Sequence, residues 1–465
     1  MKILKIFETA KDTGNRLTEI PSKERILQEK KHHACTIHIN QSETFQQIEG
    51  FGAALTESSG YVLSLIPEEK RKEALAAHFS SEGNGYTLAR THMNSCDFSL
   101  ENWACVEKED ETLESFSMER TDKYITPLIK EARDLTGGSL KLMVSPWSPP
   151  AWMKKNGEMN HGGQLLKKYY PLWAAYFVRF IEELKKRDID TWLVSVQNEP
   201  AAKQTWDSCE WTAIEEGEFA GVHLGPALKK YAASGGKQIK LLIWDHNRDF
   251  LWKRYSESMT ATGAEKYVDG AAFHWYSGDQ YEELTKFVSA YPGKMLLFTE
   301  GCVEGGPRPG AWFTGERYAH NIINDLNHGC TGWIDWNIAL DMQGGPNHVG
   351  NFCDSPLLVD TESGELHFGS SYYYIGHFSR FIRPQAVRIG AKKADSYMMP
   401  ATIDGKLGNM AECCAFKNTD GSLVLVIMNR TEADLVYDIC GKSDTGAIVL
   451  KCPPRGIQTL VLDEK

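Results

Sequence analysis

The chain has 465 residues, of which 42% are hydrophobic and 24% charged, a composition typical of globular proteins with a large buried core. Its formal net charge is −11, whereas nucleic-acid-binding proteins usually carry a basic stripe that attracts phosphates. We therefore expect no nucleic-acid partner. The sequence leaves the oligomeric state open.

Two features predict where the protein works. The first eight residues lack the apolar core of a secretory signal, and no apolar run reaches the roughly 18 residues that can cross a membrane. The eleven cysteines are odd in number and scattered, which fits free thiols in a reducing compartment better than a disulfide framework. The sequence thus predicts a cytoplasmic protein without membrane insertion.

Eight apolar runs alternate with helical patterns along most of the chain, which predicts parallel strands with helical crossovers. Eight such units are what a closed (β/α)8 TIM barrel, an α/β fold, requires. The predicted strands are 48–54, 86–93, 140–146, 191–197, 239–245, 269–275, 294–300 and 329–336. The predicted helices are 58–79, 121–135, 163–187, 217–233, 248–259, 279–290, 315–327 and 370–381.

A second, all-β region is expected to follow the barrel. After Pro384 the pattern changes to short strands with turn signals, and Asp420-Gly421 predicts a tight hairpin. The alternating segment 34–39 is expected to join this sheet. We therefore predict three parts: N-terminal strands at 1–45 that join the side β-domain, the catalytic barrel at 46–384, and a C-terminal β-sandwich at 385–465.

Two carboxylates are the candidate catalytic groups. Glu199 and Glu300 follow or end the predicted strands 191–197 and 294–300, and barrel enzymes build their sites at these strand ends. A glycosidase needs one carboxyl group that donates a proton and one that attacks or activates water. Because the two strands lie across the barrel mouth from each other, the pair predicts glycoside hydrolysis.

Eight motifs occur in order between residues 47 and 383. They are QIEGFGAALTES at 47–58, SCDFS at 95–99, SPWSPPAWMK at 145–154, NEP at 198–200, HWY at 274–276, DWN at 335–337, GGPN at 344–347 and IGHFS at 375–379. Together they resemble glycoside hydrolase family 30, the glucosylceramidase-like retaining β-glycosidases.

This resemblance implies a barrel with a side β-domain built from both termini, and hydrolysis with retention. It also implies that Glu199 is the acid/base and Glu300 the nucleophile. Further residues are matched to sugar binding or to support of the nucleophile, and Cys302 is expected in the pocket because it lies two residues past Glu300. The substrate-binding candidates are Asp97, Trp147, Asn198, Tyr276, Cys302 and Trp336. The residues expected to support the nucleophile are Arg90 and His274, and Tyr276 is also matched to a partner of the nucleophile.

Elementary electrostatics gives the expected protonation states. Arg90 beside Glu300 is expected to lower the pKa of that carboxyl and keep it ionised, whereas Glu199 is less compensated and is expected to stay protonated near neutral pH. Asn198 is expected to donate a hydrogen bond to the sugar 2-hydroxyl.

Several functions remain open. The first is a retaining exo-β-glycosidase that acts on β-glucosides or related glycosides, β-xylosides included, with a carbohydrate as its partner. The rivals are an endo-β-glycanase of the β-1,6-glucanase or xylanase type and a catalytically silent carbohydrate-binding protein. No cofactor or metal is expected, because no motif has the spacing of a metal site. A metal-dependent hydrolase using Asp245, His246 and His274 would instead lose activity with a chelator.

Overall fold

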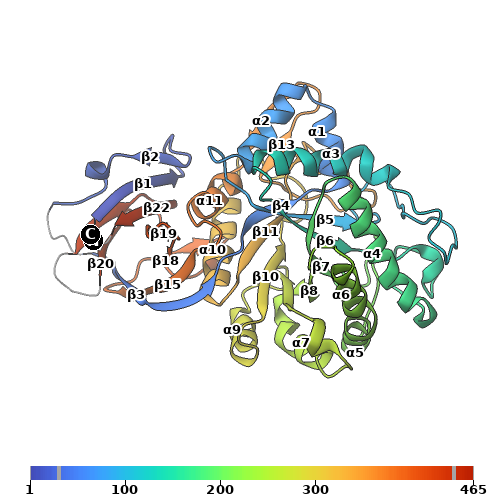
Figure 1. Ribbon diagram of the computed structural model, residues 1–465. Coiled ribbons are helices and arrows are strands. Elements are labelled where there is room, and N and C mark those ends of the chain that lie inside the picture. The colour runs from blue at the N-terminus through green and yellow to red at the C-terminus, as the bar shows by residue number, and fades with distance from the viewer. Residues whose placement is uncertain (1, 29–32, 442–446, 464–465) are drawn as a thin grey trace.

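The computed structural model describes residues 2–28, 33–441 and 447–463, and it confirms the predicted (β/α)8 barrel with a side β-domain (Figure 1). The eight parallel strands close in the order β10-β11-β4-β5-β6-β7-β8-β9. They are β4 (Gly50–Ala54), β5 (Leu88–Met93), β6 (Lys141–Pro146), β7 (Thr191–Ser195), β8 (Lys240–Asn247), β9 (Gly270–His274), β10 (Met295–Glu300) and β11 (Gly332–Asn337).

An apolar layer fills the interior of the barrel. Parallel strands with helices outside are buried on both faces, so their sequences are nearly continuous hydrophobic runs. The inward-facing side chains form one cluster, as expected for a barrel that is a packed core and not a pore. Its members are Leu88, Met143, Leu193, Leu242, Ala272, Met295, Leu297 and Ile334.

Helices surround the barrel. They are α1 (Glu57–Ser64), α2 (Glu68–Phe79), α3 (Glu119–Leu135), α4 (Tyr170–Lys186), α5 (Ala213–Glu218), α6 (Gly225–Ala233), α7 (Leu251–Ser258), α8 (Ala264–Tyr267), α9 (Tyr281–Ala290), α10 (Phe313–Asn327) and α11 (Ser370–Ser379), with a π-helical segment η4 (Phe219–Leu224) between α5 and α6. No helix in the described part of the chain is long and apolar enough to cross a membrane.

Three predicted helices differ from the observed ones. The helix expected at 58–79 is two helices, because Pro67 is extended and lacks an N–H group to continue the first. The helix expected from residue 163 begins later, since Gly163 has φ +77°. The helix expected from residue 217 begins at Ala213, where Thr212 and Glu215 form a capping box.

Both ends of the chain build the side sheet. The predicted strand at 34–39 lies in β3, which pairs with β15 and β20, and β1 pairs with β22. The predicted hairpin joins β18 to β19, with Gly421 at φ +87° in its turn. The strands, in sheet order, are β2 (Thr18–Ile20), β1 (Lys2–Ala10), β22 (Gly456–Asp463), β19 (Leu423–Asn429), β18 (Ala411–Lys417), β15 (Val387–Asp395), β3 (Cys35–Gln47), β20 (Leu435–Cys440) and β21 (Ile448–Cys452).

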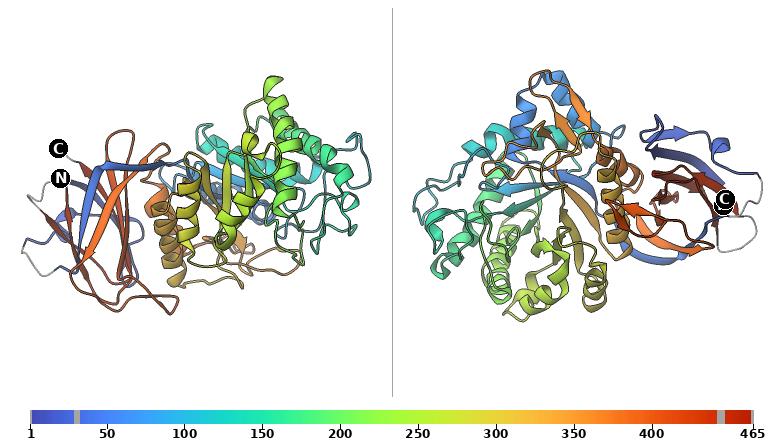
Figure 2. Two further views of the ribbon diagram at one scale, coloured as in Figure 1. Left: turned by 90° about the horizontal axis from the view of Figure 1, so that it is seen from below. Right: turned by 180° about the vertical axis from the view of Figure 1, so that it is seen from behind.

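The side domain packs against one flank of the barrel, mainly on α10 and α11 (Figure 2). Polar contacts fix this junction, among them the ion pair of Arg455 with Glu316 at 2.8 Å. Five short strands form two further small sheets. They are β12 (Leu340–Asp341), β13 (Leu357–Val359) and β14 (Leu366–Phe368) in one, and β16 (Thr402–Ile403) and β17 (Lys406–Leu407) in the other. All eleven cysteines are buried.

Candidate active site

A polar layer lies directly above the apolar layer, at the C-terminal ends of the strands. Side chains alternate along a strand, so the position two residues after an inward-facing one also points inward. In six strands the residue two positions past an apolar-layer member belongs to this polar layer or lines the space above it. These residues are Arg90, Ser145, Ser195, His274, Thr299 and Trp336.

Backbone irregularities turn three further carboxylates toward this layer. The pairing of β8 with β9 shifts at Asp245, and that of β10 with β9 shifts just before Glu300, so each strand carries a bulge that re-aims a side chain. Glu199 and Asp245 have φ values of +50° and +45°, a strained conformation that clusters at functional sites. The Glu199 N–H donates to the Asp245 carbonyl at 2.9 Å, which ties the two positions together.

Arg90 connects the groups at the centre of the site. Its guanidinium is fully buried, and Nη1 donates to Oε2 of Glu300 at 2.6 Å. Nη2 donates to Oδ1 of Asn198 at 2.7 Å and to Oδ2 of Asp245 at 2.9 Å, while Nε donates to Ser145. One side chain thereby orients the Glu300 carboxylate and the Asn198 amide at the same time.

Asp245 is a buried anion beneath the cavity. Oδ1 accepts from Thr299 at 2.6 Å and faces Nε2 of His274 at 3.1 Å. Burial alone would raise the pKa of Asp245, but the charge of Arg90 and the hydrogen bond from His274 hold it well below its usual range. Asp245 is therefore ionised throughout the physiological pH range.

His274 bridges the carboxylates. Its Nδ1 lies 3.4 Å from Oε1 of Glu199 and 4.0 Å from Oε1 of Glu300. Burial would lower the pKa of His274, but the charge of Glu300 and the contacts with Asp245 and Glu199 raise it to about 9. Since both ring nitrogens face carboxylate oxygens, the geometry also favours the imidazolium, which donates on both sides.

The pKa directions of the two candidate catalytic groups are the reverse of the sequence prediction. Burial would raise the pKa of Glu199, but the hydrogen bond from His274 and the neighbouring His246 lower it to about 2. Burial raises the pKa of Glu300, and His274 and Arg90 offset this only in part. The prediction considered Arg90 but not the buried imidazolium or the depth of Glu300, so the predicted direction of the pKa shift was wrong for both groups.

Glu300 nevertheless receives two donors. Besides Arg90 on Oε2, the Tyr276 hydroxyl donates to Oε1 at 3.1 Å. A carboxylate that accepts on both oxygens is favoured in its ionised form. By contrast, the polar neighbours of Glu199 are His274, His246 and the Gln204 amide at 3.5 Å. The two carboxyl groups are therefore chemically distinct.

Both carboxylates open into one cavity of about 240 Å³. Trp147 and Trp336 stack on each other there, with ring centroids 5.2 Å apart, and the Arg90 guanidinium lies 4.6 Å from the Trp147 ring. Arg90 and His274 themselves lie beneath the cavity and contact its carboxylates. The sequence candidates that line the cavity are Asp97, Trp147, Asn198, Glu199, Tyr276, Glu300, Cys302 and Trp336.

Asp97 is fixed on the cavity wall by two amides. Its Oδ2 accepts from Asn347 at 3.1 Å and from Asn351 at 3.2 Å. Burial and the charge of Glu300 raise the pKa of Asp97 to about 7, although the two amides act in the opposite sense. A carboxyl group that is fixed in this way can hydrogen-bond a hydroxyl of a ligand.

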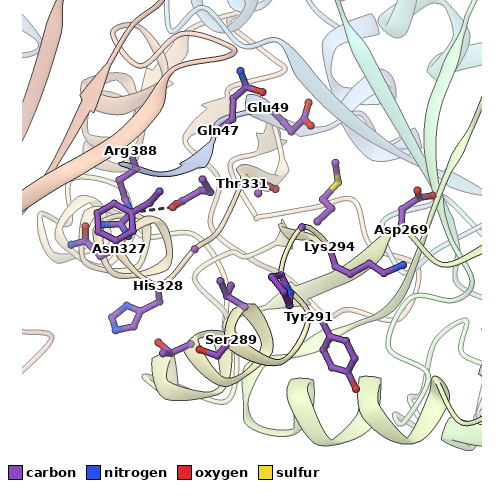
Figure 3. A pocket seen from close by; sticks show the side chains of 18 of the residues that line it. Gln47, Glu49, Asp269, Ser289, Tyr291, Lys294, Asn327, His328, Thr331 and Arg388 are labelled. Carbon is purple, nitrogen blue, oxygen red and sulfur yellow. Dashed lines mark hydrogen bonds between the residues drawn. The ribbon is translucent and has the colours of Figure 1, made fainter. Parts of the chain in front are cut away.

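A larger cavity, of about 920 Å³, lies at the other end of the barrel (Figure 3). Glu49, Asp269, Lys294 and Thr331 approach it from the barrel, and Arg388 from the side domain. Of its carboxylates, Glu49 pairs with Lys141 and Asp269 accepts the Leu241 N–H. The described residues that line the larger cavity include no facing pair of buried carboxylates, so the smaller cavity is the better candidate for catalysis.

Known proteins resemble the chain over nearly its whole length. The model of the glycosyl hydrolase family 30 TIM-barrel domain matches residues 48–382, and that of the family 30 β-sandwich domain matches residues 385–460. The chain belongs to glycoside hydrolase family 30. Family 30 hydrolases cleave glycosidic bonds, so the chain is an O-glycoside hydrolase and a carbohydrate is its expected substrate.

Relatives within family 30 differ in their stated activities. The lysosomal acid glucosylceramidase of Mus musculus is 32% identical over 439 residues, which cover 90% of this chain and 82% of that protein. The crystal structure of SrfJ from Salmonella typhimurium has a TM-score of 0.90 and 34% identity, and that of the endo-β1,6-glucanase BT3312 has 0.83 and 28%; each comparison covers 100% of both chains.

Sequence reasoning missed part of the lining of this family 30 cavity. Asp245 ends an apolar strand run, as Glu300 does. The rule that a carboxylate at the end of a barrel strand belongs to the site could therefore have identified Asp245 as a buried anion as well. The other missed residues lie in or beside loops, where no hydrophobic period marks them. They are Gln204, Trp206, Asn247, Glu304, Asn351 and Cys353.

The proposed metal set of Asp245, His246 and His274 does not form as predicted. The oxygens of Asp245 are occupied by Arg90, Thr299 and the Nε2 side of His274. Instead, Glu199 joins the two histidines, and one ligand atom from each of these three residues lies within 4.8 Å of the others.

Proposed function

We propose that the chain is a retaining exo-β-glycosidase that hydrolyses β-glucosides or closely related β-glycosides, with Glu300 as the nucleophile and Glu199 as the acid/base. The observation that carries this proposal is the unequal support of the two carboxylates. Glu300 accepts from Arg90 and Tyr276 on both oxygens, whereas Glu199 faces His274, which can give it a proton.

In the first step the Glu300 carboxylate attacks the anomeric carbon and the glycosidic bond breaks. Glu199 gives a proton to the departing oxygen. Because the pKa of Glu199 is about 2 in this structure, it must first gain that proton. We propose His274 Nδ1 as the source, since it lies 3.4 Å from Oε1, and sugar binding removes water from the carboxylate and so raises its pKa.

In the second step Glu199 accepts a proton from water, which attacks the anomeric carbon and releases Glu300. Asn198 can assist both steps. Its Oδ1 accepts from Arg90, so Nδ2 is the atom of this amide that can donate to the sugar 2-hydroxyl. Such a contact strengthens in the transition state.

The size of the cavity favours exo action. Its volume of about 240 Å³ is below the roughly 300–1,000 Å³ of most ligand pockets, which suits one sugar ring better than a run of several. The 28% identity to an endo-β1,6-glucanase makes endo action the second candidate. Product analysis separates them, because exo action releases single sugars from the first turnover. Ten buried cysteines that are free thiols further support our proposal of a cytoplasmic location.

The test is a panel of aryl β-glycosides assayed with wild type, Glu199→Gln and Glu300→Gln. We expect Glu300→Gln to lose turnover, and azide to restore turnover to Glu199→Gln on substrates with good leaving groups. Glu304→Gln is the matched control, because Glu304 sits at the cavity rim and pairs with Arg317 at 2.9 Å. The Glu304→Gln variant should still hydrolyse the aryl β-glycosides.

Proton NMR of the first product tests stereochemistry. Retention predicts that the β-anomer appears before mutarotation. Undiminished turnover in Glu300→Gln, or initial formation of the α-anomer, would contradict the assignment of Glu300 as nucleophile.

A further inference from the structure

Three side chains at the acid/base side of the cavity bring ligand atoms together as a metal site does. Nδ1 of His246 lies 3.5 Å from Oε1 of Glu199, and Nδ1 of His274 lies 3.4 Å from the same oxygen. In a tetrahedral zinc site with bonds of about 2.0–2.1 Å, neighbouring ligand atoms are roughly 3.3–3.5 Å apart. Two of the ligand–ligand distances that such a site requires are therefore already present.

His246 provides an independent observation. Its Nδ1 is buried and has no hydrogen-bond partner among the residues that the structure describes, although it faces Glu199. A buried polar atom without a hydrogen-bond partner destabilises the folded state. The ring is held in this orientation by Trp244, whose ring centroid is 4.9 Å away. Coordination of a cation would satisfy this nitrogen without moving the ring.

The surroundings also favour a cation. Three carboxylates, those of Glu199, Asp245 and Glu300, lie within this cluster, and Arg90 is the arginine that pairs with two of them. Glu199 and His246 line the cavity, so a fourth ligand position would open into it. Two imidazoles with one carboxylate and an open position is a ligand set that zinc uses in proteins. Mg²⁺ and Ca²⁺ prefer sites with six or more oxygens.

We propose that Glu199, His246 and His274 form a binding site for a divalent transition metal ion of the Zn²⁺ type, and that its occupation reversibly inhibits hydrolysis. A metal bound to Oε1 of Glu199 blocks the atom that exchanges protons in the proposed mechanism. It also replaces the proton on Nδ1 of His274. The inhibition rests on the proposed function, whereas the binding does not.

Binding is measured first, without substrate. Metal-free protein is titrated with Co²⁺, whose visible absorption is intense when it has four ligands. We expect one equivalent to give this spectrum in wild type, Zn²⁺ to abolish it, and His246→Gln to weaken Co²⁺ binding at least about tenfold. His367→Gln is the matched control, because His367 lies outside the cavity and is partly exposed. It should bind as wild type does.

Glu199→Gln is a second binding variant in case His246→Gln does not fold, which circular dichroism reports. It should also bind Co²⁺ at least about tenfold more weakly, because the amide removes the anionic ligand. A wild type without the four-ligand spectrum, or both variants binding as tightly as wild type, would overturn the site whatever the protein hydrolyses.

Inhibition is measured second, relative to the metal-free rate of each variant. We expect Zn²⁺ to inhibit wild type and His367→Gln alike, and a chelator to restore the rate. His246→Gln should require at least about tenfold more Zn²⁺. Equal sensitivity of His246→Gln and wild type would refute inhibition through this site, as would loss of wild-type activity on treatment with a chelator.

Discussion

Arg90→Lys is the substitution that best tests how the site is built. Lysine keeps the charge but concentrates it at one nitrogen, whereas the guanidinium of Arg90 donates from three nitrogens to four side chains. A lysine cannot reach Glu300, Asp245 and Asn198 in this geometry together. At least one buried carboxylate therefore loses its cationic partner.

The expected cost follows from burial. The Arg90 side chain is 0% exposed, and those of Asp245 and Glu300 are 0% and 9% exposed, so solvent screens these pairs little. Removing one partner from a buried pair costs about 3–5 kcal/mol, and because lysine retains a charge we expect about 3 kcal/mol. Loss of one oriented donor at the reacting carboxylate should lower kcat by about 10²–10³-fold.

Arg248→Lys is the matched control. Arg248 and Asp325 form another fully buried pair of the barrel, at 2.8 Å, and Arg248 does not line the catalytic cavity. Urea unfolding should show a loss of about 3 kcal/mol for both variants. The kcat of Arg248→Lys should stay within about tenfold of wild type. Equal rate losses in the two variants, or an Arg90→Lys protein with wild-type kcat, would refute the reasoning.

Two further predictions concern the neighbours of Glu300. The pKa of His274, about 9, lies above its value of 6.5 in an unfolded chain, so its stabilisation is complete below about pH 6.5 and is lost as pH rises toward 9. The free energy of unfolding of wild type should fall by up to about 3 kcal/mol across this range, and its melting temperature should fall with it. The melting temperature of His274→Gln should fall less. Parallel curves of melting temperature against pH for the two proteins would contradict a buried imidazolium. Above pH 7, where Asp97 is ionised, Asp97→Asn should lower kcat/KM for an aryl glycoside by about 10–100-fold, because hydrogen bonds to charged groups contribute about 1.5–3 kcal/mol, and an unchanged value would exclude a sugar contact at Asp97.

The barrel could be predicted from the sequence because each of its strands has a recognisable local pattern of apolar residues. Each is a short apolar run, since both faces are buried, and a helical pattern separates it from the next. The same alternation places the polar layer. Arg90 follows Leu88 by two positions, as Thr299 follows Leu297, so strand ends in the sequence point to neighbours in space.

No local sequence pattern marks the loop residues that line the cavity. Asn351 binds Asp97 across 254 positions of the chain, and Gln204 approaches Glu199 from a turn whose path is set by tertiary contacts. Neither position belongs to a hydrophobic period. Their contribution depends on where the loops fold back, which a single sequence does not encode in a readable pattern.

The predicted directions of the pKa shifts of Glu199 and Glu300 were wrong for a related reason. Proximity of Arg90 to Glu300 could be inferred, but the sign of a pKa shift depends on the balance between burial and every charge nearby. Here His274 lies within reach of Glu199, Asp245 and Glu300 together. Its proton therefore stabilises the ionised form of all three, and no pairwise argument from sequence includes that effect.

This shared imidazolium has a consequence for the proposed catalytic cycle. When Glu300 becomes an ester it loses its negative charge, 4.0 Å from Nδ1 of His274. That charge raises the pKa of His274, because a nearby negative charge favours protonation of an imidazole. The pKa of His274 should therefore fall once the ester forms. Glu199, which has given its proton to the leaving group, acts as the base for the incoming water, and attack by that water restores the charge on Glu300 and with it the affinity of His274 for its proton.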